Sequence, residues 1–324
     1  MHAVWFHAAW FTRPTQGAPM NIRTSPLVQE AAEAKRPSRW WLGWPIAILL
    51  VVIPGAAVLG IANALLGNPA AGSVTSQWIE LFTNGTTLIL LALWVILKEG
   101  RPFVSVGLRA RNWFGRFVLG VVIGAAMMAT GVFILVAAGQ YADGVSAHTT
   151  LGSAAVGTVA LLVVVWIVQG STEEIVVRGY MLQIGGLSLP AWVAIIGSSL
   201  IFAVAHLDFT PLPLINITLF AVFACFVALG QGSLWLIAGI HVGWNYFQGN
   251  VFGVPVSGHP RDVSIWAYGP TEGSSSVVNG GDFGIEGSLM GTALLAVATV
   301  IAFVYFRRSE ARRQVAPAGV SAQR

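Results

Sequence analysis

The sequence predicts an all-α, polytopic membrane protein in which about eight transmembrane helices form an intramembrane bundle around a polar cavity. Of the 324 residues, 56% have hydrophobic side chains and only 9% are charged, and the mean hydropathy is +0.74. These values lie far from those of soluble globular proteins. Apolar runs of about 20 residues also recur, which is the length that a helix needs to cross a hydrocarbon core about 30 Å thick.

Eight apolar runs fit this length and set the domain organisation. In chain order, we expect helices at residues 43–66, 77–97, 117–139, 153–176, 190–208, 212–229, 233–251 and 285–306. Residues 1–42 precede this transmembrane domain of residues 43–306, and residues 307–324 follow it. We expect both flanking segments to be cytoplasmic and disordered, with Met20 as a candidate start of translation.

Basic residues between the runs predict the orientation. They gather before the first run, between the second and third, and after the last, and all three places fall on one side of an eight-helix topology. The loops on the other side contain a single basic residue, Arg261. By the positive-inside rule, both termini are cytoplasmic, in what the composition suggests is a bacterial cell membrane. The clusters comprise Lys35, Arg36 and Arg39; Lys98, Arg101, Arg109, Arg111 and Arg116; and Arg307, Arg308, Arg312 and Arg313.

The long loop at about 252–284 is rich in Gly, Ser and Pro and lies on the side away from these clusters. A flexible connector is one interpretation, and a lid or partner-binding loop is the other. Trp266 and Tyr268 would then rest at the membrane interface, as such rings do.

The formal net charge of +4 does not indicate nucleic-acid binding. The basic residues are spread between apolar runs, and no long basic block or nucleic-acid motif occurs. Cys225, the only cysteine, lies inside an apolar run and excludes a disulfide framework. We therefore expect the lipid bilayer, and not nucleic acid, as a partner.

Few ionisable residues lie between residues 151 and 250, where the chain is otherwise apolar or neutral. A charge at the centre of a bilayer costs about 2.5–3.5 kcal/mol on insertion scales, so such residues normally face the bundle interior and serve function. Those of the Asp, Glu, His, Lys and Arg set are Glu173, Glu174, Arg178, His206, Asp208 and His241.

Helical geometry separates the two glutamates. Glu174 and Arg178 share one face at i,i+4, whereas Glu173 points about a quarter-turn away and needs another partner. The candidates are His206, which shares a face with Phe202, and His241, which shares one with Asn245. Taken singly, each of these residues is more readily explained as a packed residue or as part of a helix end. The whole set, on three separate helices, is not readily explained in that way.

These residue types suit amide-bond hydrolysis inside a membrane. A carboxylate can take a proton from water, histidines can orient that water or hold a metal, and an amide can donate hydrogen bonds to an oxyanion. Arg178 would fix Glu174 and offset the second negative charge. No HExxH zinc motif, G-x-S-x-G elbow, P-loop or dinucleotide fingerprint occurs.

In these motifs the chain resembles the CAAX protease and bacteriocin-processing (ABI) family, which includes the type II CAAX prenyl endopeptidases. The EExxxR motif matches Glu173, Glu174 and Arg178, the FxxxH motif matches Phe202 and His206, and the HxxxN motif matches His241 and Asn245. The resemblance covers roughly residues 151–250, and beyond that range only the hydropathy agrees.

The resemblance implies an intramembrane endopeptidase with an all-helical bundle. Glu173 would be the general base, His206 its water-orienting partner, and His241 with Asn245 the oxyanion stabilisers. The family is commonly described as metalloproteases, so Glu173, His206 and His241 are candidate ligands for Zn²⁺. A metal-free mechanism, in which a glutamate activates water, uses the same residues.

Two other function classes stay open. A proton-coupled transporter would use intramembrane Glu and His as a relay, but the ordered motifs argue against it. The other class is a non-proteolytic membrane scaffold or immunity-type protein. The loss of a motif residue would distinguish such a protein, and no motif residue is lost here.

Overall fold

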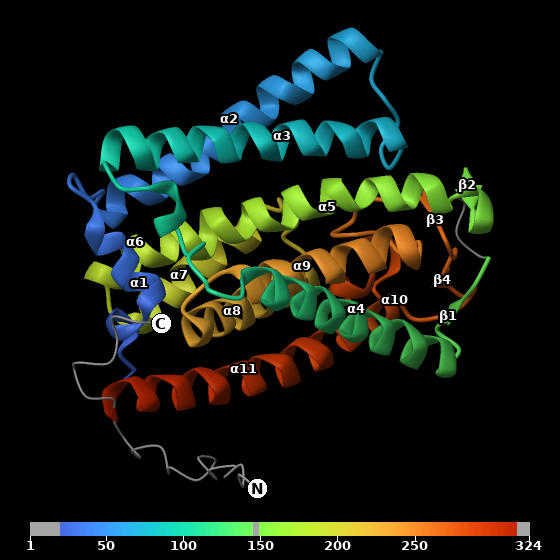
Figure 1. Cartoon of the computed structure of the whole chain (residues 1–324). Helices are drawn as coiled ribbons and strands as arrows, with labels where there is room; N and C mark the ends of the chain where they lie inside the picture. Colours follow the sequence, from blue (N-terminus) through green and yellow to red (C-terminus); the bar gives the residue numbers. More distant parts are fainter. Residues whose placement is uncertain (1–19, 145–148, 316–324) are drawn as a thin grey trace, which may run out of the picture.

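The computed structural model describes residues 20–144 and 149–315, and within these ranges the chain is almost entirely helical. The long helices run side by side along one direction, and short turns close both ends of the bundle (Figure 1). The predicted fold class, an all-α polytopic membrane protein, is confirmed.

Eight apolar helices form the bundle, each near a predicted position. Six of them, with α5 counted through to Ser188, are long and apolar enough to cross a membrane in the described ranges. The other two are shorter: α7 has 14 residues, and α9 has 12 before it continues as a π turn. The eight are α2 (Trp40–Leu66), α3 (Val74–Leu93), α4 (Trp113–Ala137), α5 (Val156–Val176), α7 (Ala191–Val204), α8 (Pro211–Gln231), α9 (Trp235–Tyr246) and α11 (Leu289–Val315).

The short helix α7 ends where the backbone reverses. Leu207 has a φ of 57°, in the left-handed region that a branched residue enters only under strain. The chain then turns, and α8 begins at Pro211, a residue suited to the first helical turn. His206 thus lies at the tip of an α7–α8 hairpin, which we define as residues 191–231.

Three helices continue into π turns. Turn η3 (Trp94–Glu99) extends α3, η6 (Val177–Met181) joins α5 to α6 (Leu182–Ser188), and η7 (Phe247–Val251) extends α9. A π turn adds a residue to the helical repeat and so re-aims the side chains that follow it.

Helices α4 and α9 pack backbone against backbone through two G-x-x-x-G stripes. A Cβ added at Gly120 would lie 2.2 Å from the Leu236 carbonyl oxygen, and one at Gly239 would lie 2.1 Å from that of Phe117. Gly124 and Gly243 meet the opposite backbone in the same way. Only glycine permits this approach, which fixes α9, and His241 within it, against α4.

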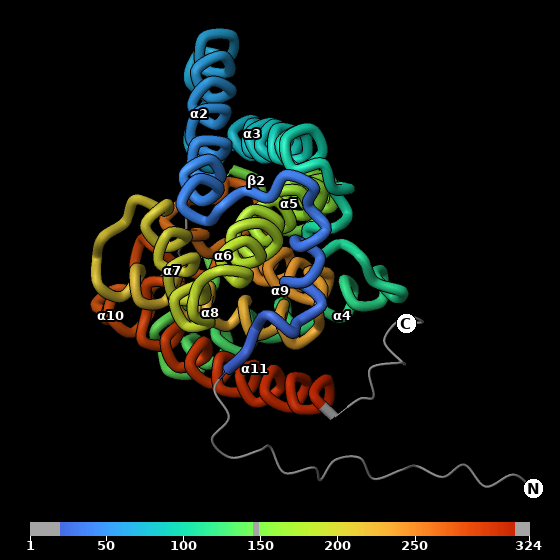
Figure 2. Tube along the Cα trace, turned by 90° about the vertical axis from the view of Figure 1, so that its left-hand side faces the viewer, coloured from blue at the N-terminus to red at the C-terminus, as the bar shows by residue number. Residues whose placement is uncertain are grey.

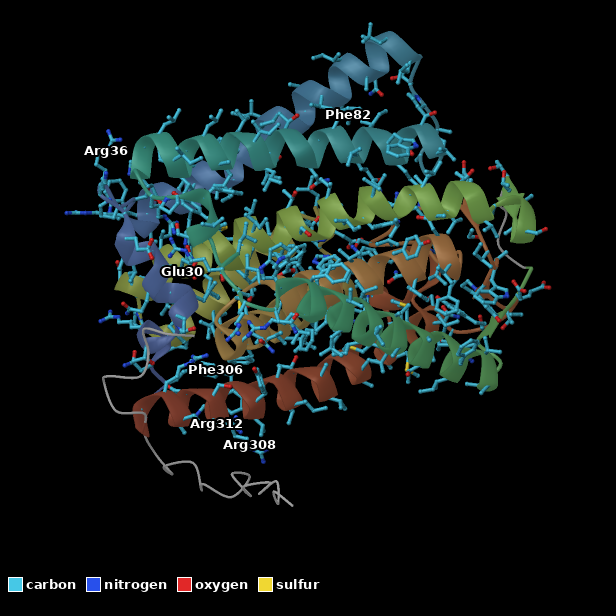
Figure 3. The ribbon with its side chains drawn as sticks, viewed as in Figure 1. Glu30, Arg36, Phe82, Phe306, Arg308 and Arg312 are labelled. Carbon is cyan, nitrogen blue, oxygen red and sulfur yellow. The ribbon has the colours of Figure 1, made fainter. Side chains whose placement is uncertain are left out.

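We call the end of the bundle where α2 begins and α11 ends the inner end. Arg36, Arg308 and Arg312 lie toward it (Figure 3). Residues 20–39 form short helical turns that run across the helix ends here (Figure 2). This packing differs from the disorder predicted for residues 1–42, because Ile22, Leu27 and Val28 are buried in the main core. The turns are η1 (Ile22–Thr24), α1 (Pro26–Gln29), η2 (Glu30–Glu33) and, from the α3–α4 loop, η4 (Phe103–Ser105).

The flanking segments are otherwise only partly described. Helix α11 continues to Val315, so residues 307–315 are helical and not the disordered tail that the sequence suggested. The predictions for residues 1–19 and 316–324 lie outside the described residues.

The opposite, outer end is covered by residues 252–287, which we call the cap. Two short ladders join it to other loops: β1 (Tyr141–Ala142) pairs antiparallel with β4 (Gly269–Pro270), and β2 (Thr150–Leu151) pairs parallel with β3 (Val263–Ser264). The Tyr141 hydroxyl also donates to the Asn279 carbonyl at 2.9 Å. The flexible-connector interpretation is therefore wrong. Short turns complete this end: α10 (Ser276–Asn279), η8 (Gly281–Phe283), η9 (Ile285–Gly287) and, before α5, η5 (Gly152–Ala154).

Candidate active site

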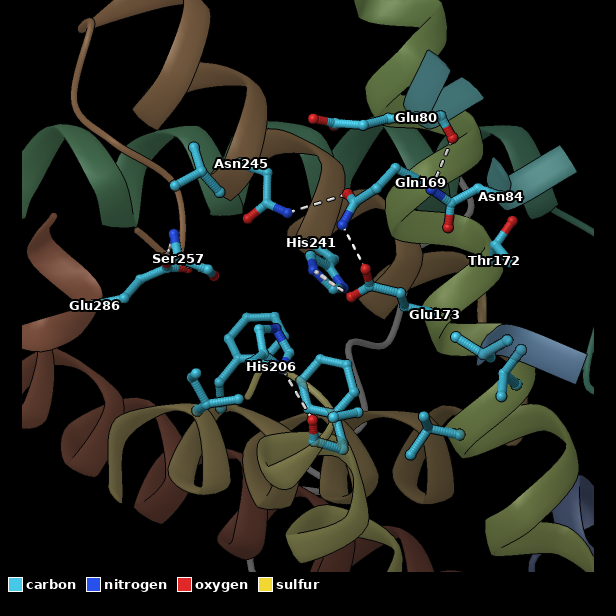
Figure 4. A pocket seen from close by; sticks show the side chains of 18 of the residues that line it. Glu80, Asn84, Gln169, Thr172, Glu173, His206, His241, Asn245, Ser257 and Glu286 are labelled. Atoms are coloured by element: carbon cyan, nitrogen blue, oxygen red, sulfur yellow. Dashed lines mark hydrogen bonds and ion pairs between the residues drawn. The ribbon is translucent and has the colours of Figure 1, made fainter. Parts of the chain in front are cut away.

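A cavity of about 640 Å³ lies between α2, α3, α5, the α7–α8 hairpin, α9 and the cap. Four of the residues that the sequence singled out line it: Glu173, His206, His241 and Asn245 (Figure 4). The other two, Glu174 and Arg178, do not line the cavity and are completely buried behind its wall. The structure thus gives the adjacent glutamates different environments.

Glu174 is held by a cation and an imidazole. Its Oε1 accepts a hydrogen bond from Arg178 Nη1 at 3.0 Å and lies 2.8 Å from His241 Nδ1. The Arg178 guanidinium also lies over the Phe202 ring, 4.6 Å from its centroid. An ion pair without exposed surface needs such additional contacts to offset its desolvation, and the pair holds the His241 imidazole from behind the cavity wall.

Glu173 faces the cavity with its side chain 27% exposed. Gln169, one helical turn earlier on α5, donates from Nε2 to Glu173 Oε1 at 2.5 Å. The Asn245 amide in turn donates to Gln169 Oε1 at 3.1 Å. The three side chains form a chain of hydrogen bonds from α9 to the carboxylate, and it leaves Glu173 Oε2 without a hydrogen-bond partner among the described residues.

His241 stands between the two glutamates. Its Nδ1 faces Glu174, and its Nε2 lies 3.6 Å from Glu173 Oε2, beyond direct hydrogen-bonding distance. The Nδ1 contact orients the ring, because the hydrogen bond made by one imidazole nitrogen sets the tautomer and aim of the other. The Phe220 ring packs edge-on against the imidazole at 4.9 Å between centroids.

His206 reaches the cavity from the hairpin tip. Its Nδ1 lies 2.9 Å from the Phe202 carbonyl oxygen, and its ring packs edge-on against the Phe202 side chain. The FxxxH spacing therefore places His206 against both the backbone carbonyl and the ring of Phe202. In the described contacts His206 meets neither Glu173 nor His241, although all three line one cavity.

The cap contributes polar residues to the cavity. Arg261 donates to Glu80 on α3 at 2.6 Å, and its guanidinium lies over the Trp166 ring at 4.6 Å. His259 also lines the cavity. Burial, and next the nearby Arg261 charge, lower the pKa of His259 below its usual value, which favours the neutral imidazole.

Glu286 fastens the cap to α9. Its carboxylate accepts hydrogen bonds from the Ser257 backbone amide at 2.6 Å, the Ser257 hydroxyl at 3.0 Å and the Trp244 indole at 3.0 Å. Gln248 donates to it as well, at 3.3 Å. Several segments therefore meet at one carboxylate at the edge of the cavity.

The residues that the resemblance suggests as zinc ligands do not converge on one point in the described part of the chain. A zinc site needs three or more protein ligands converging on one point, and the described part of the chain contains no such group of His, Cys, Asp or Glu side chains. His241 Nδ1 contacts Glu174 and His206 Nδ1 contacts a backbone carbonyl, which are the contacts that orient a histidine whose Nε2 binds a ligand. Zinc binding by Glu173, His206 and His241 stays a prediction.

Several cavity residues were missed from the sequence, although signals for them existed. Gln169 lies one turn before Glu173, Glu80 lies inside a predicted span, and Glu286 opens another. Arg261 was noted only as the sole basic residue of its loops. His259 carried no signal, because its contribution depends on how the cap folds.

Comparison with known proteins gives one match. Residues 155–247 match the family model described as type II CAAX prenyl endopeptidase Rce1-like. No curated protein and no solved structure matches the chain. The matched range begins at α5 and ends within η7, so it contains every residue of the three motifs.

Proposed function

We propose, from this type II CAAX prenyl endopeptidase match at residues 155–247, that the protein is an intramembrane endopeptidase of the CAAX protease type. It would hydrolyse a peptide bond in a membrane-associated protein or peptide by using a water molecule activated by Glu173. The observation that carries this proposal is the contrast between the two glutamates. Glu174 is neutralised by Arg178 behind the wall, whereas Glu173 faces the cavity with one oxygen free of hydrogen bonds among the described residues.

The arrangement supports a general-base mechanism. Glu173 Oε2 accepts a proton from water as the hydroxide adds to the scissile carbonyl carbon. The same carboxyl then returns that proton to the nitrogen of the leaving amine as the C–N bond breaks. The products are an amine and a carboxylic acid, which releases its remaining proton to become a carboxylate, and the carboxylate of Glu173 is regenerated.

The other motif residues have supporting tasks in this proposal. Gln169 fixes Glu173 Oε1 and so leaves Oε2 for water. His206 orients the water from the hairpin tip. The Asn245 amide and the imidazole of His241, which line the same cavity, would stabilise the transition state by hydrogen bonds to the tetrahedral oxyanion. Asn245 would exchange its bond to Gln169 for one to substrate, or use its second amide hydrogen.

We further propose that both termini of this integral membrane protein are cytoplasmic, in a bacterial cell membrane. The basic residues that flank the helices at the inner end support this orientation by the positive-inside rule. The inner end would then face the cytoplasm, and the cap would lie outside.

The test compares purified parent protein with Glu173→Gln in detergent, with peptide cleavage followed by mass spectrometry. The variant keeps size and polarity but loses the basic oxygen, so we expect normal folding and a loss of turnover of at least a hundredfold, in the range attributed to general-base catalysis. Glu272→Gln, which alters an exposed carboxylate on the cap, is the matched control and should cleave at the parent rate.

Two results would contradict the proposal. Undiminished cleavage by Glu173→Gln at equal protein amounts would remove Glu173 as the base. No cleavage of any candidate peptide by the parent would favour the non-proteolytic scaffold. A proton-coupled transporter would not cleave peptides in detergent, where no gradient exists.

A further inference from the structure

The path by which a substrate reaches Glu173 follows from which walls of the cavity are closed. We infer that the cavity receives its substrate sideways from the bilayer, through an opening between α2 and the tip of the α7–α8 hairpin, in the half of the bilayer nearer the outer end. The substrate would be a membrane-anchored peptide whose scissile bond lies in that half, away from the basic clusters. This inference rests on the proposed function, because it specifies the substrate of the same site.

The inner end is closed by a buried polar network. Arg101 donates to the Gln183 side-chain carbonyl at 2.9 Å, and Gln183 donates to the backbone carbonyls of Leu27 and Ser105, each at 2.8 Å. Arg101, Gln183, Leu27 and Ser105 are all at most 2% exposed. A peptide approaching from the inner end would have to break these buried hydrogen bonds, each of which is costly to leave unmade.

The inner part of α2 is closed as well. The Trp44 indole donates to the Met181 carbonyl at 2.8 Å, and its ring fills the space beside Gly185 and Gly197. Gly43 packs equally closely, since a Cβ there would lie 2.3 Å from Ile184. The first turns of α2 therefore seal the side of the bundle up to Ala47.

Beyond Ala47 the same side is open. Ile48, Val51 and Val52 line the cavity but are 39%, 40% and 56% exposed, so they form a wall that lipid can reach. Across the cavity, Leu207 at the hairpin tip also lines it and is 78% exposed. The outer part of α2 leans away from the rest of the bundle (Figures 1 and 2). Residues that line the cavity and are also exposed at the protein surface mark an entrance.

The depth of this entrance follows from helix geometry. Val52 lies 12 residues after Trp40, which at 1.5 Å per residue is roughly 18 Å from the inner start of α2. On α2 the entrance runs from Ile48, roughly 12 Å from that start, to Val52, so it lies about the middle of the bilayer and continues toward the cap. Because α7 ends at Val204, the hairpin tip stops at this depth and leaves the gap uncovered.

The two sides of the cavity differ in polarity, which suggests how a peptide would lie in it. The entrance is apolar, whereas the roof presents Ser257, His259 and Arg261. The roof is fixed in place by the Arg261–Glu80 ion pair and the Glu286 contacts. An apolar segment of the substrate would therefore occupy the entrance, and its unpaired peptide groups would face the polar roof beside Glu173, where hydrogen bonds replace those lost from water.

The experiment uses cross-linking and needs no catalysis. A single cysteine is placed at Leu207 in the Glu173→Gln variant and coupled to a benzophenone maleimide. The native Cys225 is completely buried and should not compete for the label. The protein is reconstituted into sealed phosphatidylcholine–phosphatidylglycerol vesicles, which are sorted by whether a C-terminal tag, attached at the inner end, is inside or outside.

The probe is a palmitoylated peptide with charged residues that prevent it from crossing the bilayer, and it is added outside the vesicles. We expect at least tenfold more cross-linking at Leu207 when the tag is inside, because the probe then occupies the half nearer the outer end. The matched control is a cysteine at Leu42, which is exposed on the first turn of α2 and should show the opposite preference.

Three outcomes would overturn the inference: a preference for the tagged face at Leu207, equal cross-linking from both faces, or no cross-linking at Leu207 when Leu42 reacts normally. None of these depends on cleavage. A failure of the proposed function, which the detergent assay detects, is therefore distinguishable from a failure of the proposed entrance.

Discussion

Neighbouring residues of the same type have different tasks in this site. Glu173 and Glu174 differ by one position, yet Glu174 pairs with Arg178 in the interior and Glu173 faces the cavity. The i,i+4 arithmetic predicted this division, because a step of 100° turns one carboxylate away from the arginine. The same arithmetic could not predict the role proposed for Gln169. An amide four residues before a carboxylate is common on a helix, and it matters to the reaction only if that carboxylate, here Glu173, is the proposed base.

Gln169 gives the most specific prediction at the residue scale. Gln169→Ala removes the donor that fixes Glu173 Oε1, and a hydrogen bond to a charged group contributes about 1.5–3 kcal/mol. We expect kcat to fall roughly ten- to a hundredfold with KM and thermal stability little changed. Steady-state kinetics of peptide cleavage provide the measurement.

Two controls separate this positioning effect from a general disturbance. Asn84→Ala removes another amide from the cavity wall, one that donates only to the carbonyl of Glu80 on its own helix in the described contacts, and should leave kcat unchanged. The double variant Gln169→Ala/Asn245→Ala should lose less than the two single losses combined, because both belong to one hydrogen-bond chain. An additive double loss would contradict the chain.

At the scale of elements, the join between α5 and η6 combines stability with chemistry. Arg178 is the second residue of the π turn η6, and both Arg178 and Glu174 lack exposed surface. Arg178→Ala would leave an uncompensated buried carboxylate, which costs about 3–5 kcal/mol. We expect a clearly lower unfolding temperature in detergent and poor expression, measured against Arg308→Ala, which removes an exposed arginine. Equal unfolding temperatures would show that the Glu174–Arg178 pair is not needed for stability.

The sequence predicted where helices form better than where they end. All eight apolar runs became helices, because burial of long apolar stretches requires internally hydrogen-bonded backbone. The end of α7 was missed: the predicted helix ran to residue 208, but α7 ends at Val204 and the backbone reverses at Leu207. The cap was misjudged because its order comes from contacts such as Glu286–Ser257 that join residues 29 positions apart.

The segment at the inner end should respond to pH. Burial is the largest cause that raises the pKa of Glu30 from 4.5 to about 7, despite its hydrogen bond from the Gly107 amide and the nearby Arg109. The folded state thus binds a proton more tightly than the unfolded chain. This contribution to stability is complete below about pH 4.5 and is lost as the pH rises through about 7.

Hydrogen exchange of residues 21–34 measures this effect. We expect faster exchange at pH 8 than at pH 5.5 after correction for the intrinsic rate, and Glu30→Gln should abolish most of the difference. Glu33→Gln is the matched control, because Arg109 lowers the pKa of the Glu33 carboxyl and thereby keeps it ionised across this range. A pH dependence that is unchanged in Glu30→Gln would assign it to another group.

At the scale of the whole molecule, topology is the first matter to test. A cysteine at Ser275, which is exposed on the cap, should react with a membrane-impermeant maleimide in intact cells. A cysteine at Arg308 should react only after permeabilisation, because that residue is exposed and lies in the basic cluster near the C-terminal end of α11. Labelling with the reverse pattern would invert the orientation that the basic residues predict.

The closed inner end also bears on the energetics of the cell. A hydrolase inside a membrane must admit water to its cavity, yet a continuous water column across the bilayer would carry protons down their gradient and discharge it. The packed layer of Leu27, Tyr180, Met181 and Gln183 interrupts any such column below Glu173. A membrane that contains this protein would therefore stay insulated against protons at the level of the inner end.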